Sequence, residues 1–316
     1  MSTHPQDEVQ DHSLTDPESF WAEQASHLSW HKKPTKTLTR VKKSLRSGVK
    51  HDHWEWFQGG EISTCFNCVD RHVLAGNGDQ TAIIWDSPVT KTKQKYTYKQ
   101  LLDEVEVFAG VLRDEGVKKG DVVLVYTPTA LRAIRRDDPE NKLFKERGER
   151  GGLRSLQALF LAGERSEPSI VTMYQDLLEK YGKQGAKVID NWWSSESGSP
   201  ISGIALVPHA GKDRYTTERG VESLAIKPGS AGKAMPGFDV RVVDDSGKEV
   251  EKGNMGNIVM GMPLAPTGFR TLWEDEERFY KGYLKRFDGK WIDTGDAGMI
   301  DTDGTGKVPL TLLFNS

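Results

Sequence analysis

Residues 190–196 read DNWWSSE, with two tryptophans followed by two serine hydroxyls and the carboxylate of Glu196. Hydroxyl and carboxylate oxygens are hard ligands of the kind that Mg²⁺ prefers, above all when the ion carries a nucleotide phosphate. The indole rings could form the wall of a pocket. A Ser/Glu loop that follows a strand is also a common helix cap, so these residues alone leave a metal site and a cap as alternatives.

A second candidate lies at residues 293–296, which read DTGD. The glycine predicts a tight turn at a hairpin corner. A carboxylate held in that turn, Asp296, is well shaped to accept both hydroxyls of a ribose. A turn without any ligand is the alternative.

The two cysteines, Cys65 and Cys68, stand in the order CFNC. This spacing occurs in redox pairs and in zinc sites, which need a second pair of ligands. No second Cys-x-x-Cys exists in the chain, so buried structural thiols are favoured over metal or redox chemistry.

The elements that position the first candidate precede it in the sequence. Residues 157–161 and 186–190 are predicted strands, and residues 170–181 between them form a predicted helix with an apolar face. A crossover helix makes its two strands parallel, and parallel strands end at the same edge of the sheet. Residues 163–165 (GER) and 191–196 should therefore converge on one crevice at that edge, where open α/β folds bind ligands.

An earlier α/β unit precedes this one. Residues 81–86 are predicted to form a buried strand, residues 97–116 a helix, and residues 121–126 a further strand. Thr97 and Gln100 form a capping box at the start of the helix, whose core face includes Phe108. Before residue 81 the chain shows little periodicity, so an extended segment anchored by aromatic side chains is expected there.

The last third alternates between apolar and polar residues and contains Ser-Gly and Asp-Gly turn pairs. Residues 238–250, 256–260 and 289–304 are predicted to form antiparallel hairpins. The fold class is therefore α/β: parallel sheet units followed by a C-terminal antiparallel β region.

The overall charge and hydropathy exclude several classes of partner. The formal net charge of -3 indicates neither nucleic-acid binding nor an anionic membrane surface. No apolar run approaches the roughly 18 residues that a membrane helix needs. The first twenty residues contain no lysine or arginine, which argues against a transit or signal peptide and predicts a cytosolic protein.

Several stretches in order resemble the AMP-forming short-chain acyl-CoA synthetases, the acetyl- and propionyl-CoA synthetases of the adenylate-forming superfamily. They are TPTALRAIRRDDP, LFLAGERSEP, DNWWSSESGSPI, GSAGKAMPGFDV and WIDTGDAG, preceded by WFQGGEISTCFNCVDRHVLAGNGDQTAIIWDSPVT. The resemblance runs from about residue 16 to residue 304. It implies the incomplete large domain of an adenylate-forming enzyme, with segments at residues 1–75 (N-terminal segment), 76–126 and 127–305 (AMP-binding domain) and 306–316 (aberrant tail).

The resemblance implies a ligase that joins a short-chain carboxylate to coenzyme A through an acyl-adenylate made from Mg·ATP, with AMP released. In such a site Trp193 would close the acyl pocket and Glu196 would hold Mg²⁺. The residues that would contact the nucleotide are Gly163, Glu164, Arg165, Asp190, Asn191, Trp192, Trp193, Ser194, Ser195 and Asp296.

Three departures from the family pattern bear on activity. The family has Gln-Thr where this chain has Ser194 and Ser195. Its phosphate loop, a Ser/Thr/Gly-rich run ending in Pro-Lys, should lie between Tyr126 and Thr127, which are adjacent here. The last residues, VPLTLLFNS, resemble nothing in the family and replace the start of its lysine-bearing C-terminal domain. We therefore assign no catalytic residue and expect an inactive chain: a nucleotide-binding pseudoenzyme, or the product of a faulty gene model or splicing event.

Overall fold

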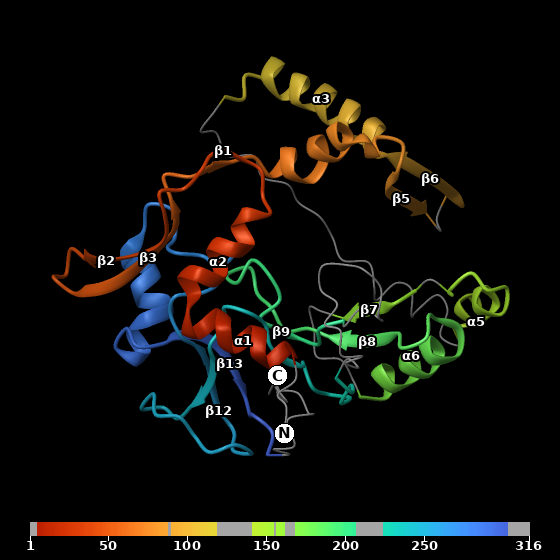
Figure 1. Ribbon diagram of the computed structural model, residues 1–316. Helices are drawn as coiled ribbons and strands as arrows, with labels where there is room; N and C mark the ends of the chain where they lie inside the picture. The colour runs from red at the N-terminus through yellow and green to blue at the C-terminus, as the bar shows by residue number, and fades with distance from the viewer. Residues whose placement is uncertain are drawn as a thin grey trace. The chain divides into compact units, whose positions relative to one another are not determined.

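The computed structural model describes residues 5–87, 90–118, 141–154, 156–161, 168–206 and 224–302 (Figure 1). The chain forms two compact units. The first comprises Met1–Trp21, Thr37–Trp56 and Ala133–Ser316, and the second comprises Ala22–Lys36 and Phe57–Arg132. The segment boundaries expected from the family resemblance stay a prediction.

A parallel strand pair forms one part of the first unit. Strands β7 (Ala158–Leu161) and β8 (Lys187–Asp190) are joined by helix α6 (Pro168–Tyr181), as the sequence predicts. Figure 1 shows α6 alongside this pair. Gln175 of α6 links helix to strand, because its side chain accepts the backbone N–H of Val188 and donates to the carbonyl oxygen of Ala186. The register places the last residues of both strands side by side, so the chain leaves both at one edge of the sheet.

The antiparallel region predicted for the last third is confirmed as a three-stranded sheet. Its strands are β11 (Val240–Val243), β12 (Gly256–Met260) and β13 (Ile292–Gly298), in that order across the sheet. Phe238, Ile258 and Met260 are almost completely buried in the largest core cluster. Burial of each such side chain contributes roughly 1.5–3 kcal/mol, so this core is the main source of stability around the sheet.

Short elements complete this unit. They are α5 (Lys142–Glu149), β9 (Ser202–Gly203), β10 (Lys233–Ala234), α7 (Glu276–Phe279), the π-helix η3 (Tyr280–Leu284) and the 3₁₀-helix η4 (Lys285–Phe287). Strands β9 and β10 pair antiparallel.

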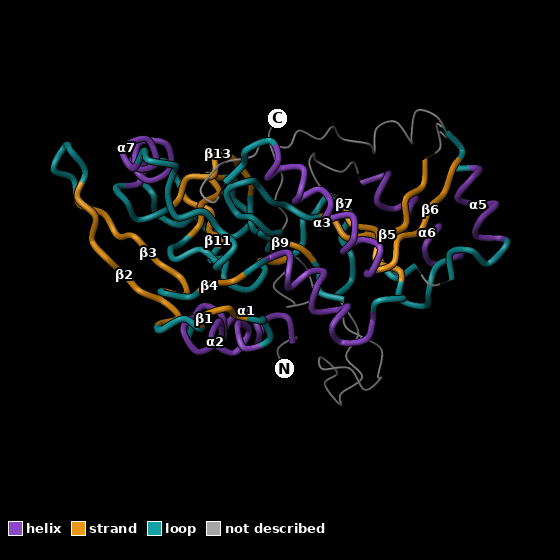
Figure 2. Tube along the Cα trace, turned by 90° about the horizontal axis from the view of Figure 1, so that it is seen from above, coloured by secondary structure: helices purple, strands orange, loops and turns teal. Residues whose placement is uncertain are grey.

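The expectation of an extended N-terminal segment is wrong. The chain starts with helices α1 (Pro5–Thr15) and α2 (Pro17–Ser26), and strands β2 (Lys36–Ser44) and β3 (Lys50–Gln58) form the long hairpin seen in Figure 2. Helix α1 has no apolar stripe because the side chains that it buries, Gln6 and Ser13, are polar. Gln6 donates to the carbonyl oxygen of Gly203 (3.2 Å) and accepts the N–H of Ala205 (3.0 Å).

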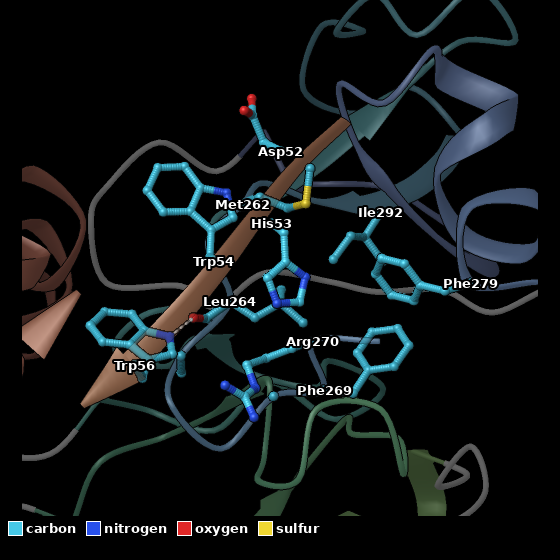
Figure 3. Close-up of a pocket in the computed structure, with 12 residues that line it drawn as sticks. Asp52, His53, Trp54, Trp56, Met262, Leu264, Phe269, Arg270, Phe279 and Ile292 are labelled. Carbon is cyan, nitrogen blue, oxygen red and sulfur yellow. Dashed lines mark hydrogen bonds between the residues drawn. The ribbon is translucent and has the colours of Figure 1, made fainter. Parts of the chain in front are cut away.

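The expected aromatic anchoring does occur within the first unit. The indole N–H of Trp56 donates to the carbonyl oxygen of Leu264 at 3.0 Å, as the dashed line in Figure 3 shows. Trp21 packs against the largest core cluster, and its ring meets that of Trp56 edge-on.

The second unit contains the predicted capped helix. Helix α3 (Tyr98–Asp114) begins after Thr97, and the capping box between Thr97 and Gln100 is present. It packs against a hairpin of β5 (Thr81–Ser87) and β6 (Thr92–Thr97), which pair antiparallel. The unit also contains β1 (Trp30–Lys32), β4 (Glu61–Ile62) and the π-helices η1 (Phe66–Asp70) and η2 (Val73–Asn77).

Burial in this unit contradicts three expectations. Ile84 of β5 is 60% exposed and Phe108 of α3 is 62% exposed, so neither the strand nor that face of the helix is buried. A two-stranded hairpin with one helix against it leaves its other face to solvent. Cys65 and Cys68 are exposed free thiols, not buried ones. The strand predicted at residues 121–126 lies outside the described residues.

No helix in the described ranges is both long enough and apolar enough to cross a membrane.

Candidate active site

The loop that follows β8 contains most of the predicted nucleotide contacts. Asp190 ends the strand and is half-buried, and the backbone N–H of Asn191 donates to the carbonyl oxygen of Leu161 at 2.9 Å. The side-chain amide of Asn191 donates to the carbonyl oxygen of Ser202 at 3.0 Å. Asn191 therefore links the loop to β9 through the side chain that the family resemblance assigns to the nucleotide.

The structure brings together two motifs that are 104 residues apart in the sequence. The indole N–H of Trp192 donates to Oδ2 of Asp296 at 3.0 Å. Trp192 is 7% exposed and belongs to the core cluster that contains Phe238. Burial raises the pKa of Asp296, and the hydrogen bond from Trp192 opposes that rise. A half-buried carboxylate and an indole thus form one corner beside the end of β8.

Asp296 does not lie at a hairpin corner, as predicted, but within strand β13. Val259 pairs with Asp293 and Asn257 with Ala297, so four steps of β13 face two steps of β12. This irregularity is a bulge at residues 294–296. The hydroxyl of Thr294 holds the bulge in place by donating to the carbonyl oxygen of Ile258. β-Bulges of this kind change the direction of a side chain, which is how the strand presents its carboxylate to the loop.

Glu196 lies in the same loop with a defined partner. The hydroxyl of Tyr283 donates to its Oε1 at 3.0 Å, and the N–H of Phe269 donates to its backbone carbonyl oxygen at 2.8 Å. A hydrogen bond from its own backbone N–H and a weaker one from Tyr283 hold the pKa of Glu196 below its ordinary value despite partial burial. An ionised carboxylate has about four lone-pair sites, so beside these donors Glu196 can still accept a cation.

The two serines of the loop differ in environment. Ser194 is half-buried, whereas Ser195 is exposed. Ser197 is fully buried, and its hydroxyl accepts the N–H of Ser194 at 3.1 Å and lies 2.8 Å from the carbonyl oxygens of Ser194 and Ser199. Trp193 is 50% exposed, so part of its side chain is open to solvent.

Sequence reasoning missed Ser197 and Tyr283, which hold the loop and its carboxylate. Neither had a local signal, because Ser197 acts through burial and Tyr283 comes from a distant element. Gly163, Glu164 and Arg165, expected to line the adenine, lie outside the described residues.

A second polar cluster lies at the N-terminal hairpin. His51 and His53 of β3 are 4% and 5% exposed, and Oε1 of Glu276 lies 3.1 Å from His51 Nε2 and 3.9 Å from His53 Nδ1. Lys43 and Thr271 bind the other oxygen of Glu276. Figure 3 shows His53 beside a cavity of about 20 Å³, space for roughly one water molecule.

Within the parts of the chain that the structure describes, no three His, Cys, Asp or Glu side chains are grouped as a metal site.

Comparison with known proteins identifies the class. A family model described as AMP-binding enzyme matches residues 70–135 and 124–269, which is more than half of the chain. The chain therefore belongs to the AMP-binding enzyme family, within the adenylate-forming superfamily. The acetyl-coenzyme A synthetase N-terminus model matches residues 6–68, which places the chain with the acetyl-CoA synthetases of that family, as its motifs predicted.

The chain is also similar to individual relatives and to one solved structure. The chain is 23% identical to human acyl-CoA synthetase short-chain family member 3, mitochondrial, over 512 residues, covering 92% of the chain and 70% of that protein. It is 47% identical to acetyl-coenzyme A synthetase of Serratia proteamaculans over 117 residues, which are 37% of the chain and 17% of that protein. The crystal structure of the anthranilate CoA ligase AuaEII with anthranoyl-AMP is 24% identical with a TM-score of 0.33, covering 47% of the chain and 23% of that structure.

Many positions in the alignment with the human relative have no residue of this chain. The alignment runs over 512 positions, whereas 92% of the 316 residues is about 290, so roughly 220 positions have no residue of this chain. The sequence motifs predict that a block of the family's large domain is missing between Tyr126 and Thr127, and that position stays a prediction.

Proposed function

We propose that this chain binds adenosine monophosphate, alone or joined to a short-chain acyl group, at the corner between the loop after β8 and strand β13. The observation that carries the proposal is the contact of Trp192 with Asp296, because it joins the two motifs that the family resemblance assigns to the nucleotide. AMP-binding is the property by which the matching family is described.

Each side chain has a distinct part in this proposal. Asp296 accepts ribose hydroxyls, and Trp193 limits the acyl group to a few carbons. Glu196 holds Mg²⁺ when a phosphate-bearing nucleotide enters. ATP and coenzyme A would be the co-substrates of the whole family reaction.

We also propose that the chain forms acyl-adenylate too slowly to act as a ligase. Adenylation depends on backbone amides and a lysine that neutralise the departing pyrophosphate, and no Ser/Thr/Gly-rich run ending in Pro-Lys exists in the sequence. One such donor contributes about 3–4 kcal/mol to transition-state stabilisation. Loss of the whole loop would therefore lower the rate by far more than a thousandfold.

Isothermal titration with AMP tests the binding proposal. The chain should bind AMP saturably, and Asp296→Ala should weaken binding roughly tenfold to a hundredfold, the contribution of charged hydrogen bonds. Asp103→Ala is the control, since Asp103 pairs with Lys99 on an exposed face of α3 in the other unit. Equal binding by both variants would refute the assignment.

The second candidate is the complete short-chain acid–CoA ligase reaction, favoured by the names of the relatives. Pyrophosphate exchange with acetate or propionate separates the two candidates. Exchange above background would establish a working ligase and overturn the proposal of slow adenylation. The cytosolic location predicted from the first twenty residues stays a prediction.

A further inference from the structure

The indole of Trp192 is held more firmly than a pocket wall requires. Its ring lies in the main core cluster, its carbonyl oxygen accepts the N–H of Ile201 at 2.8 Å, and its backbone bridges to Ser202. An indole fixed in this way cannot follow a ligand. Its N–H therefore points at one place, which Oδ2 of Asp296 occupies.

The two carboxylate oxygens of Asp296 differ in their hydrogen bonds. Oδ2 accepts the indole N–H, whereas no hydrogen bond from the described residues reaches Oδ1. The backbone on either side is fixed by the bulge of β13, and the N–H of Asp296 itself donates to the hydroxyl of Thr294 at 3.2 Å. Rotation of the carboxylate is thus the remaining freedom, and the indole removes it.

We propose that Trp192 is a positioning residue that orients Asp296, so that Oδ1 is presented to one hydroxyl of a ribose. This inference rests on the proposed function and adds a specificity to it. The two ribose hydroxyls are unequal: the one that meets Oδ1 has an acceptor with both lone pairs open, whereas Oδ2 already serves the indole. Removing the favoured hydroxyl should weaken binding roughly tenfold or more, and removing the other should have a clearly smaller effect.

Trp192→Phe separates orientation from packing, because phenylalanine keeps an aromatic ring in the core and removes only the donor and part of the ring. Carboxyl ¹³C NMR of the unliganded protein should show a higher pKa for Asp296 in this variant, since burial raises that pKa and the indole opposes the rise. The acid limb of AMP binding should move to higher pH with it. Trp273→Phe, at a side chain that is 81% exposed, should change neither.

Binding of 2′-deoxy-AMP and 3′-deoxy-AMP completes the test. Wild type should discriminate strongly between them, and Trp192→Phe should discriminate much less. If Trp192→Phe unfolds, the wild type alone decides: the ¹H–¹⁵N signal of the Trp192 indole should shift with the titration of Asp296.

The outcomes separate this inference from the proposed function. An unchanged titration of Asp296 in Trp192→Phe, or an indole signal that ignores pH, would overturn the positioning role even if AMP binds. Equal affinity of wild type for the two deoxynucleotides would overturn the specificity. Failure of AMP to bind, with the indole signal following Asp296, would refute the proposed function and leave the orientation of the carboxylate standing.

Discussion

Gly198 offers a sharp test of how the loop after β8 is built. It follows the buried Ser197, its φ is +62°, and an added Cβ would lie 2.2 Å from the carbonyl oxygen of Thr267. A backbone oxygen cannot swing aside as a flexible side chain can. The contact also lies where the hydroxyls of Ser199 and Thr267 meet at 2.8 Å, so the loop has little room to retreat.

Two costs add in Gly198→Ala. A non-glycine residue in the left-handed region costs roughly 1–2 kcal/mol. Forcing an extra carbon into a closed contact costs about 1–3 kcal/mol. We therefore expect the free energy of unfolding to fall by about 2–5 kcal/mol, and AMP binding to weaken because Glu196 and its neighbours move.

Gly289→Ala is the matched control. Gly289 has a φ of +80° and belongs to the same unit, and apart from its own chain neighbours no atom lies within 4 Å of the position that an alanine methyl group would take there. It should lose only the conformational cost, roughly 1–2 kcal/mol, and bind AMP normally.

Urea unfolding followed by circular dichroism measures both variants against wild type. The reasoning requires Gly198→Ala to lose at least about 1 kcal/mol more than Gly289→Ala. Equal losses, with normal AMP binding in both, would show that the contact between the loop and Thr267 does not constrain the site.

Three other outcomes are expected. The first unit should lose stability on acidification. Burial lowers the pKa of His53, so folding favours its neutral form, and the stabilisation that this gives is lost as the pH falls below about 6.5. The pKa of Glu276 is also lowered, so its ionised form stabilises the fold and a further loss follows at lower pH. Glu276→Gln should flatten a plot of melting temperature against pH only below about pH 4.5, where Glu276 itself titrates, and should not flatten it near pH 6, because the Glu276 carboxylate opposes the lowering of the His53 pKa. An unchanged slope below about pH 4.5 would contradict this. Trp56→Phe should cost about 1 kcal/mol in urea unfolding through its lost hydrogen bond, against no change for Trp273→Phe. Both cysteines should react with a thiol reagent in the native protein, and protection without denaturant would refute their exposure.

Elements with a local chemical signal were predictable from the sequence. The capping box at Thr97 and the crossover helix between the two parallel strands depend on neighbouring residues, and both are present. The strand order predicted that residues 163–165 and 191–196 converge, and residues 163–165 lie outside the described part of the chain. The contact of Trp192 with Asp296 agrees with the family resemblance, which assigns both side chains to the nucleotide, and strand order alone did not predict it.

Features set by distant contacts were not predictable. Helix α1 is held to the rest of the unit by the hydrogen bonds of Gln6 and has no apolar face. The apolar periodicity that predicts a helix is therefore absent from its sequence. The exposure of Ile84 depends on which elements cover a hairpin, and its apolar sequence cannot specify them. The bulge that aims Asp296 arises from the register between β12 and β13, which local turn signals do not encode.

The docking of Gln6 has a consequence for how such proteins can be recombined. Its amide supplies a donor and an acceptor to Gly203 and Ala205, just downstream of the nucleotide loop, in the manner of a short extra strand. The N-terminal family segment and the AMP-binding segment are therefore not interchangeable blocks. A chimera that takes each from a different parent must preserve this amide, or the backbone beyond β9 is left with two polar groups to satisfy from solvent.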